Sequence, residues 1–205
     1  MGIAVDLLHA SVDELARREA AFAAALERVG YPDPRISEPG YVTLLRAIVG
    51  QQVSLAAARA IWGKLDAAVG GAADPERMLE AGDDQLRAAG LSRQKIAYAR
   101  SLAELVTAGE LDLHNLPAED EAAVARLVEV KGIGRWSAEI YLLFAEGRPD
   151  IFPAGDLAVQ IELGRILGID GRPTEKQLRA LSEPWRPHRG AAAIFAWHHY
   201  RTAVL

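Results

Sequence analysis

A pair of closely spaced glycines and a single acid further along the chain have the residue types for chemistry. Gly132 and Gly134 stand between two helical patterns, and Asp156 opens another helical pattern. Glycines permit positive φ and a tight reversal, and they leave backbone N–H groups accessible. The N–H groups at the start of the second helix point outward and attract anions such as phosphate. A carboxylate such as Asp156 can stabilise developing positive charge or orient a water molecule.

Each of these features also has an ordinary structural interpretation. A Gly-x-Gly segment between helices is commonly a simple corner with glycine at the helix C-terminus. Asp156 is most simply the N-cap of the helix that follows it. The cap and the functional carboxylate are compatible, because the positive end of a helix favours a negative charge. The glycines and the acid alone therefore do not distinguish a structural role from a functional one. The residues around them are needed for that.

Composition narrows the class of protein. The chain has 205 residues, half of them hydrophobic, which suits one large domain or two small lobes sharing a core. It has no Cys, which excludes disulfides, cysteine nucleophiles, thiolate zinc sites and iron–sulfur clusters. No apolar run of membrane-spanning length and no secretory signal are found, and the absence of Cys fits the cytoplasmic location that we expect. The formal charge of −5 weighs against a nucleic-acid partner, but oriented backbone N–H groups bind phosphate without formal charge.

The apolar spacing is helical almost throughout, and alternating strand patterns are absent. Ser11 is the expected cap of an N-terminal helix that reaches about Val29, with Glu14 completing a capping box. Ser54 and Ser92 are expected to cap two later helices. Further helices are expected over residues 75–81, 83–89, 93–108, 119–130, 135–146, 156–168, 174–181 and 189–201.

The string around the glycines is more specific than the glycines themselves. It reads Leu127-x-x-Val130-x-Gly132-Ile133-Gly134-x-Trp136-Ser137-Ala138. This string resembles the helix-hairpin-helix of the base-excision DNA glycosylase superfamily, and it is most similar to the 3-methyladenine DNA glycosylase II, or alkylbase, branch. Three other segments match that branch in order, and they are residues 46–54, 90–95 and 184–189. The resemblance therefore extends over residues 40–200.

The resemblance implies a function in base excision repair. A monofunctional DNA glycosylase of this branch hydrolyses the N-glycosidic bond of alkylated purines such as 3-methyladenine and 7-methylguanine, leaving an abasic site. The family carries its catalytic acid at Asp156, where a negative charge stabilises the oxocarbenium-like C1′. Bifunctional members have a lysine nucleophile where this chain has Trp136, so we expect no lyase activity. The expected partner is double-stranded DNA with damaged bases, bound by a monomer at the bacterial nucleoid.

The resemblance also assigns a substrate pocket. Trp136 and Trp197 are expected to stack on the extruded base, since aromatic faces attract a cationic methylated purine. Ile140 stands where related enzymes often have an aromatic residue. Core packing is an equal alternative for Trp197 from its own segment, and core packing is the preferred interpretation of Trp185. The expected DNA contacts are Gly132, Gly134, Arg135, Lys131, Gln51 and Gln52.

Two of these contacts occupy the family's wedge position, where a side chain fills the gap left by the extruded base. Gln52 is the preferred wedge over Gln51, and a polar helix junction is the alternative for both. No cofactor is expected for the reaction. Family hairpins hold a monovalent cation through main-chain carbonyls, which implies a Na⁺ or K⁺ site at Val128, Val130 and Ile133.

These inferences together predict an all-α fold of two helical lobes with a DNA-binding cleft between them. One lobe would comprise residues 1–36 and 153–205, and the other residues 37–152, with the helix-hairpin-helix at 120–146. The N-terminal β-rich domain of larger bacterial members is expected to be absent. Three alternatives stay open: the same fold acting on another damaged or mismatched base, a non-catalytic DNA-binding module, and a hairpin that mediates protein contacts.

Overall fold

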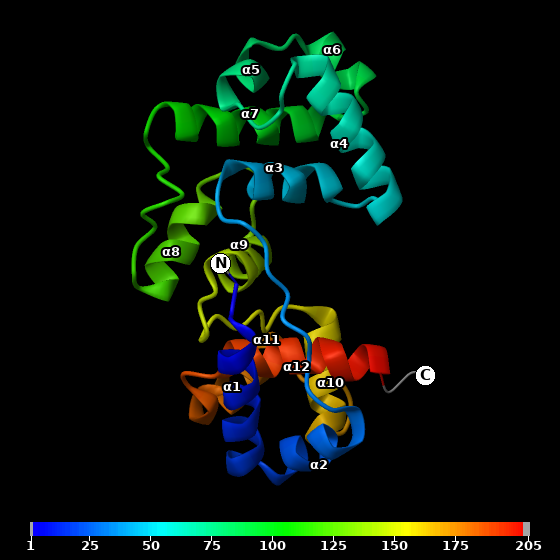
Figure 1. The fold of residues 1–205 in the computed structure, drawn as a ribbon, viewed down its shortest axis with the longest axis vertical. Coiled ribbons are helices and arrows are strands. Elements are labelled where there is room, and N and C mark those ends of the chain that lie inside the picture. The colour runs from blue at the N-terminus through cyan, green and yellow to red at the C-terminus, as the bar shows by residue number, and fades with distance from the viewer. Residues whose placement is uncertain (1, 203–205) are drawn as a thin grey trace. The chain divides into compact units, whose positions relative to one another are not determined.

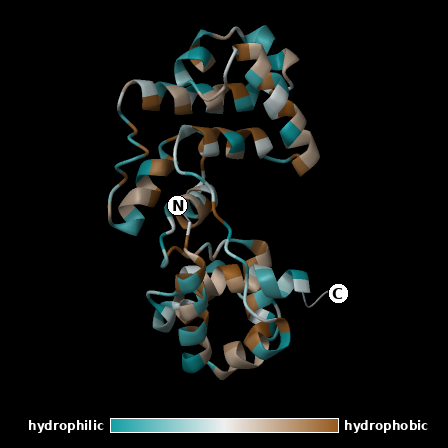
Figure 2. Ribbon diagram, in the orientation of Figure 1, coloured by the Kyte–Doolittle hydropathy of each residue, from teal (hydrophilic) through white to brown (hydrophobic). Residues whose placement is uncertain are grey.

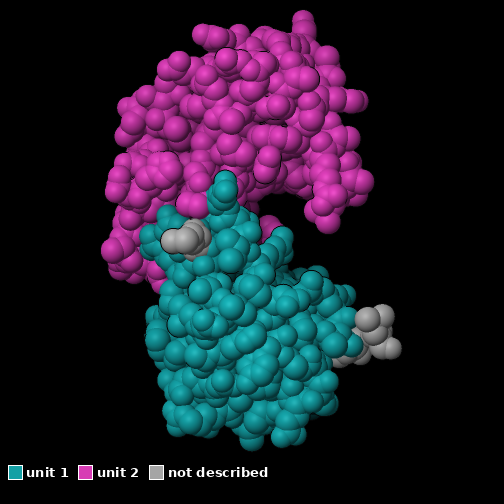
Figure 3. Space-filling model, viewed as in Figure 1, with its two compact units in different colours: residues 1–38, 142–205 teal, residues 39–141 magenta. Residues whose placement is uncertain are grey.

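The computed structural model describes residues 2–202, and these are helical with no β-strand among them, which confirms the expected all-α fold. The described residues form two compact units (Figure 3). Unit 1 takes its residues from 1–38 and 142–205, and unit 2 comprises residues 39–141. None of the helices within residues 2–202 is long and apolar enough to cross a membrane.

Unit 2 is a bundle of short helices built around two of them. The bounds are α3 Tyr41–Gly50, α4 Leu55–Val69, α5 Pro75–Glu80, α6 Asp83–Ala88, α7 Arg93–Thr107, α8 Asp120–Val128 and α9 Arg135–Tyr141. Helices α3 and α7 lie side by side (Figure 1), and α3 also contacts α4 and α9. Helices α5 and α6 pack on α7, and α8 packs on α9. The two central helices thus connect the rest of the unit to the hairpin between α8 and α9.

Local signals explain where the helices of unit 2 begin. The hydroxyl of Ser54 accepts a hydrogen bond from the Ala57 N–H at 3.2 Å, and that of Ser92 accepts one from the Lys95 N–H at 3.3 Å. Both expected serine caps are therefore confirmed, since each satisfies a donor that the helix leaves unpaired. Along the helices hydrophobic and hydrophilic residues alternate (Figure 2), because one face of each helix is buried and the other solvated.

Unit 1 is built around the C-terminal helix. Its elements are α1 Val5–Arg18, α2 Ala20–Val29, the π-helix η1 Leu142–Glu146, α10 Leu157–Ile166, α11 Glu175–Leu181, the 3₁₀ helix η2 Glu183–Trp185 and α12 Arg189–Thr202. Helix α12 contacts α1, α2 and α10 (Figure 1). Every residue from Ala191 to Ala196 is buried, because neighbours cover α12 on several sides. Four alanines in this stretch let the neighbouring helices approach closely.

The expected start of the N-terminal helix is wrong. Helix α1 begins at Val5, so Ser11 lies inside it rather than at its cap. The Ser11 side chain is buried, with its hydroxyl 3.0 Å from Nδ1 of His188. Glu14 does not complete a capping box but pairs with Arg17 and Arg18, and their hydrogen bonds lower the pKa of Glu14 to about 2. Sequence spacing suggested a cap because serine and glutamate three residues apart satisfy that pattern anywhere in a helix.

The single helix expected to reach Val29 is also interrupted. Glu19 is extended, with φ −131° and ψ 113°, and separates α1 from α2. Arg18, at the end of α1, donates to the carbonyls of Pro184 and Arg186, each at 2.8 Å. The break therefore coincides with contacts to a segment more than a hundred and sixty residues away, which no local pattern in the N-terminal region encodes.

The boundary between the units falls before Leu142, earlier than the expected boundary at residue 153. The segment 142–152 belongs to unit 1 because its polar groups bond there. The carbonyl of Phe144 accepts from the Ser37 N–H at 2.8 Å. Asp150 forms ion pairs with Arg186 at 2.5 Å and with Arg189 at 2.9 Å. The expected helix 135–146 changes at the same place from α9 to the π-helical turn η1.

Two neighbouring leucines test the placement of α1, because only one of them is buried. Leu8 is fully buried, whereas 47% of Leu7 is exposed. Leu8→Ala should lower the free energy of unfolding by about 3 kcal/mol, since it leaves a cavity in the core. Leu7→Ala should change the free energy of unfolding by less than about 0.5 kcal/mol. Urea unfolding of both variants checks this, and equal effects would contradict the placement of α1.

Candidate functional site

The expected hairpin lies in unit 2, between α8 and α9. It is closed by a hydrogen bond from the Ile133 N–H to the Val130 carbonyl at 3.0 Å. Helix α9 starts at Arg135, directly after Gly134. The first backward hydrogen bond of this helix runs from Ala138 to Gly134 at 3.0 Å, so the N–H groups before Ala138 project from the helix end. That arrangement suits an anion such as phosphate.

Helix α7 packs against the hairpin. Gly132 has φ +86°, and a Cβ built on it would lie 2.1 Å from Cδ2 of Tyr98, so a side chain there cannot fit without moving the hairpin. The Lys131 N–H donates to the Ser101 hydroxyl at 3.3 Å. Gly134 differs, because apart from its immediate chain neighbours no heavy atom of the described residues lies within 4 Å of a Cβ built on it. Gly132 therefore faces the protein, and Gly134 faces open space.

The two basic residues of the hairpin have different surroundings. Lys131 is exposed. Arg135 forms ion pairs with Glu121 at 2.5 Å and with Glu139 at 3.0 Å. The hydrogen bond with Glu121 and the charges of both carboxylates raise the pKa of Arg135. Arg135 was expected to add positive charge for DNA, but two carboxylates offset its charge and tie the guanidinium to α8 and α9.

The turn between α3 and α4, residues 51–54, is here called the wedge turn. Gln51 is half-buried, and its Nε2 donates to the Gly132 carbonyl at 2.8 Å. Gln52 is exposed and has φ +56°, the one non-glycine residue with positive φ among the described residues. A left-handed conformation is uncommon for a residue such as Gln and is often found at functional sites. The structure thus separates two residues that the sequence left side by side: Gln51 contacts the hairpin, and Gln52 is exposed to solvent.

Asp156 lies in unit 1, at the N-terminus of α10. Its Oδ1 accepts a hydrogen bond from the Val159 N–H at 2.9 Å, which makes it the N-cap of that helix. The same oxygen accepts a second hydrogen bond from Nε1 of Trp197 at 3.1 Å. The side chain is partly exposed. Two donors therefore hold the carboxylate in one orientation while part of it stays accessible, an arrangement that can stabilise a nearby positive charge.

Trp197 belongs to an aromatic cluster that also includes a residue missed by the sequence analysis. The rings of Phe144 and Trp197 are 5.5 Å apart, and the guanidinium of Arg35 lies 4.9 Å from the Phe144 ring centroid. Phe144 follows Ile140 by one helical turn. The sequence could have indicated it as the aromatic residue that is absent at position 140. Trp185 is 1% exposed, which confirms its expected place in the core.

The other two expected pocket residues lie in unit 2. Trp136 stands in the first turn of α9 and is 50% exposed, which is unusual for so large an apolar side chain. Ile140, one turn later, is half-buried. The structure therefore groups Asp156, Trp197 and Phe144 in unit 1, and groups the wedge turn with the hairpin in unit 2.

The histidines near the chain end have structural partners. His199 is buried, and its Nδ1 lies 2.6 Å from the Glu162 carboxylate. A ring nitrogen of His198 lies 2.9 Å from the Val29 carbonyl. Within residues 2–202, no group of three or more His, Asp or Glu side chains is placed to hold a metal ion.

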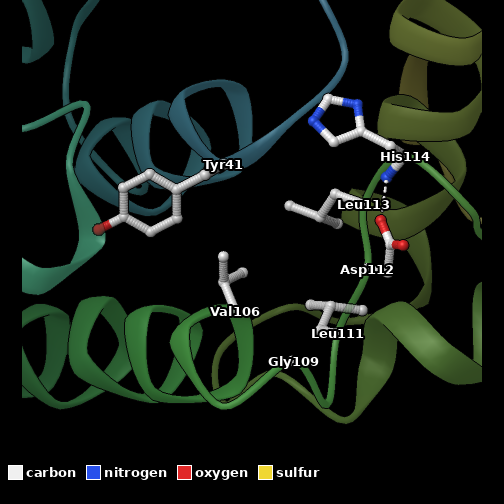
Figure 4. Close-up of a pocket in the computed structure, with 7 residues that line it drawn as sticks. All are labelled: Tyr41, Val106, Gly109, Leu111, Asp112, Leu113 and His114. Atoms are coloured by element: carbon white, nitrogen blue, oxygen red, sulfur yellow. Dashed lines mark hydrogen bonds between the residues drawn. The ribbon is translucent and has the colours of Figure 1, made fainter.

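A pocket of about 260 Å³ in unit 2 is separate from the candidate residues. It is lined by Tyr41, Val106, Gly109, Leu111, Asp112, Leu113 and His114 (Figure 4). The Tyr41 ring faces this pocket while its hydroxyl points away (Figure 4), and burial raises the pKa of Tyr41. That hydroxyl is buried without a hydrogen-bond partner in the described part of the chain. The Asp112 side chain in this lining accepts a hydrogen bond from the N–H of His114 at 2.9 Å.

Comparison with known proteins agrees with the helical architecture and the hairpin. The model of the HhH-GPD superfamily of base excision DNA repair proteins matches residues 45–187. This chain belongs to that superfamily. The matched region contains the wedge turn, the hairpin and Asp156.

Individual relatives have related names. DNA-3-methyladenine glycosylase 1 of Schizosaccharomyces pombe is 32% identical over 166 residues, covering 77% of this chain and 71% of the relative. A DNA-3-methyladenine glycosidase from Bacillus halodurans superposes with a TM-score of 0.86 at 31% identity, covering 95% of this chain and 90% of the other. The S. pombe 3-methyladenine DNA glycosylase bound to abasic DNA gives a TM-score of 0.78 at 29% identity, covering 95% and 97%. A Bacillus subtilis relative is longer, and this chain spans 58% of its length.

The contrast between the hairpin glycines is testable by alanine substitution. Gly132→Ala should lower the free energy of unfolding by about 3 kcal/mol, because positive φ and the Tyr98 ring both oppose a Cβ. Gly134→Ala should change it by less than about 0.5 kcal/mol. Chemical denaturation of the two variants measures this difference. A Gly132→Ala protein as stable as the wild type would show that the hairpin does not rest on α7.

Proposed function

We propose that this chain is a monofunctional DNA glycosylase that hydrolyses the N-glycosidic bond of alkylated purines in duplex DNA and leaves an abasic site. The observation that carries the proposal is the pair of hydrogen bonds on Asp156 Oδ1, from Val159 and Trp197. The names of the relatives and the abasic-DNA complex of the S. pombe enzyme support it. We further propose that the enzyme acts as a monomer at the nucleoid.

Asp156 serves as the catalytic acid-base and electrostatic group in this proposal. The C1′–N bond breaks, and its electron pair leaves with the base. The sugar then carries positive charge at C1′, which the Asp156 carboxylate stabilises. A water oxygen bonds to C1′, and the proton that it loses passes to the carboxylate and then to solvent. The products are a free base and an abasic site.

The substrate class follows from the aromatic residues. A purine methylated at N3 or N7 is cationic, so its departure as a neutral base is favourable. Trp136 and Trp197 present indole rings, and electron-rich rings attract cations at close range. Trp136 is half-exposed and therefore accessible to a base. An indole carries no amine that can attack C1′, so the proposed reaction ends at the abasic site without strand cleavage.

In this proposal most of the DNA contact comes from backbone N–H groups, and few charged side chains take part. The N–H groups that precede Ala138 hold a phosphate, with Gly134 permitting its close approach. Lys131 is exposed and adds charge there. Gln52 fills the gap left by the extruded base and hydrogen-bonds the orphaned partner.

Base release from methylated duplex DNA tests the proposal. Asp156→Asn should slow single-turnover release at least about a hundredfold, because the charge that stabilises C1′ is lost. Abasic sites are read by strand cleavage with alkali, and nicks should be absent without alkali. The matched control is Asp74→Asn, since Asp74 caps α5 by accepting from the Glu76 N–H at 2.9 Å. This variant should retain wild-type release.

Three outcomes would count against parts of the proposal. Equal release by the wild type and Asp156→Asn would remove Asp156 from the reaction. Nicks without alkali would show lyase activity. Release by the wild type from hypoxanthine or ethenoadenine duplexes only would keep the glycosylase and change its substrate class.

We also propose that the hairpin holds Na⁺ or K⁺ through the carbonyls of Val128, Val130 and Ile133. The Val130 carbonyl accepts one hydrogen bond, from Ile133, and retains a second lone pair. The three carbonyls are the ones that the resemblance implies, and the neighbouring Gly132 carbonyl accepts a hydrogen bond from Gln51. A cation there would steady the hairpin backbone and neutralise part of a bound phosphate's charge.

Replacing K⁺ by tetramethylammonium at equal ionic strength tests this cation. Affinity for an abasic-analogue duplex should fall about threefold or more, and the melting temperature of the free protein should fall with it. Equal affinities and melting temperatures in the two salts would remove the cation from the proposal, whatever the outcome of the base-release assay.

A further inference from the structure

Gln51 joins two segments of unit 2 that lie far apart in the sequence. Its Nε2 donates to the Gly132 carbonyl at 2.8 Å, across 81 residues. Its own N–H donates to the Ile48 carbonyl at 3.3 Å, which ends α3. Gln51 is half-buried. The carboxamide is therefore already committed to the hairpin backbone before any ligand is present.

Helix α7 fixes the same two segments. Nζ of Lys95 donates to the Val49 carbonyl at 2.7 Å, at the C-terminal end of α3, where the helix dipole favours a cation. Burial lowers the pKa of Lys95. One turn later Tyr98 lies against Gly132, and its hydroxyl accepts a hydrogen bond from Gln94. Helix α7 thus contacts both the C-terminal end of α3 and the hairpin, and it fixes the two segments relative to each other.

The hydrogen bond from Gln51 to Gly132 restrains the backbone of the next residue, Gln52. Gln52 adopts φ +56°, and a left-handed residue other than glycine persists only where its surroundings hold it. The backbone on one side of Gln52 is fixed by Gln51, and on the other side Ser54 caps α4. Loss of the bond from Gln51 to Gly132 would release one of these two restraints and allow Gln52 to relax to an ordinary conformation.

We propose that Gln51 is a positioning residue that couples the wedge turn to the hairpin, so that Gln52 is held in place for insertion while the hairpin holds a phosphate. The proposal rests on the proposed function. It departs from a role in which Gln51 contacts DNA itself. It also predicts that the two glutamines act as one unit, because Gln51 acts only through Gln52.

A double-mutant cycle separates the two roles. The quantity measured is the ratio of the dissociation constants for an undamaged duplex and for a duplex with a tetrahydrofuran abasic analogue. Gln51→Ala and Gln52→Ala should each lower this ratio about fivefold, the change expected for one ordinary hydrogen bond. The double variant should lower it no further than the larger single change. Independent DNA contacts would multiply to about twenty-five-fold and would overturn the proposal.

Two further variants guard against a merely structural effect. Gln85→Ala is the matched control, because Gln85 also donates its Nε2 to a backbone carbonyl in unit 2, that of Ala68. It should keep the wild-type ratio. Gln51→Glu keeps the side-chain size but loses the donor, so it should lower the ratio as Gln51→Ala does and serves in the cycle if the alanine variant does not fold. A wild-type ratio for Gln51→Glu would overturn the proposal.

The ratio of dissociation constants does not depend on whether the protein releases a base. Insertion is followed separately by the fluorescence of 2-aminopurine placed opposite the abasic analogue, which should change on binding of the wild type and change less with Gln51→Ala. An unaltered fluorescence change in Gln51→Ala would show that Gln52 inserts without Gln51. A wild type that releases no methylated base would contradict the proposed function, while the binding ratios would still report on Gln51.

Discussion

The close packing of the hairpin on α7 depends on the absence of a side chain at Gly132. Because Gly132 has no Cβ, the Tyr98 ring packs directly against the hairpin backbone, and the Gly132 carbonyl also accepts a hydrogen bond from Gln51. The Lys131 N–H donates a hydrogen bond from the hairpin to α7, to the Ser101 hydroxyl. A phosphate site made of backbone N–H groups gains most when those groups are already ordered, since ordering on binding costs free energy. A single glycine thus lets the hairpin backbone pack against α7, which orders it before any ligand binds.

In unit 1 a single hydrogen bond has two consequences. The bond from Trp197 to Asp156 orients the carboxylate and fixes the indole ring together. Phe144 packs on that ring from the π-helical turn η1, and Arg35 lies over Phe144. An inserted residue in a helix often marks a functional site, and here the π-helical turn is where Phe144 joins the cluster. The carboxylate and the aromatic wall are therefore one preorganised arrangement rather than two separate features.

Much of this could be predicted from the sequence because its causes are local. Ser54 and Ser92 cap helices through N–H groups three residues away, and Asp156 does the same at α10. The hairpin follows from Gly132 and Gly134 between two apolar-periodic segments. The all-α class follows from helical spacing along the whole chain. Capping, glycine geometry and periodicity each involve residues within a few positions of one another, and such residues are adjacent in the sequence as well as in space.

The tertiary structure alone decided what those residues touch. Arg135 is offset by Glu121 and Glu139, which makes the hairpin less positive than its residues suggest. The break at Glu19 accompanies the bonds that Arg18 makes to a distant turn. The resemblance favoured Gln52 over Gln51 as the wedge, but only folding shows that Gln51 bonds to the hairpin while Gln52 is exposed. The sequence by itself therefore determined the all-α class, the caps at Ser54, Ser92 and Asp156, and the chemical groups available. Partners far along the chain decided which groups stay accessible, because charges and hydrogen bonds are satisfied by whatever folding brings near.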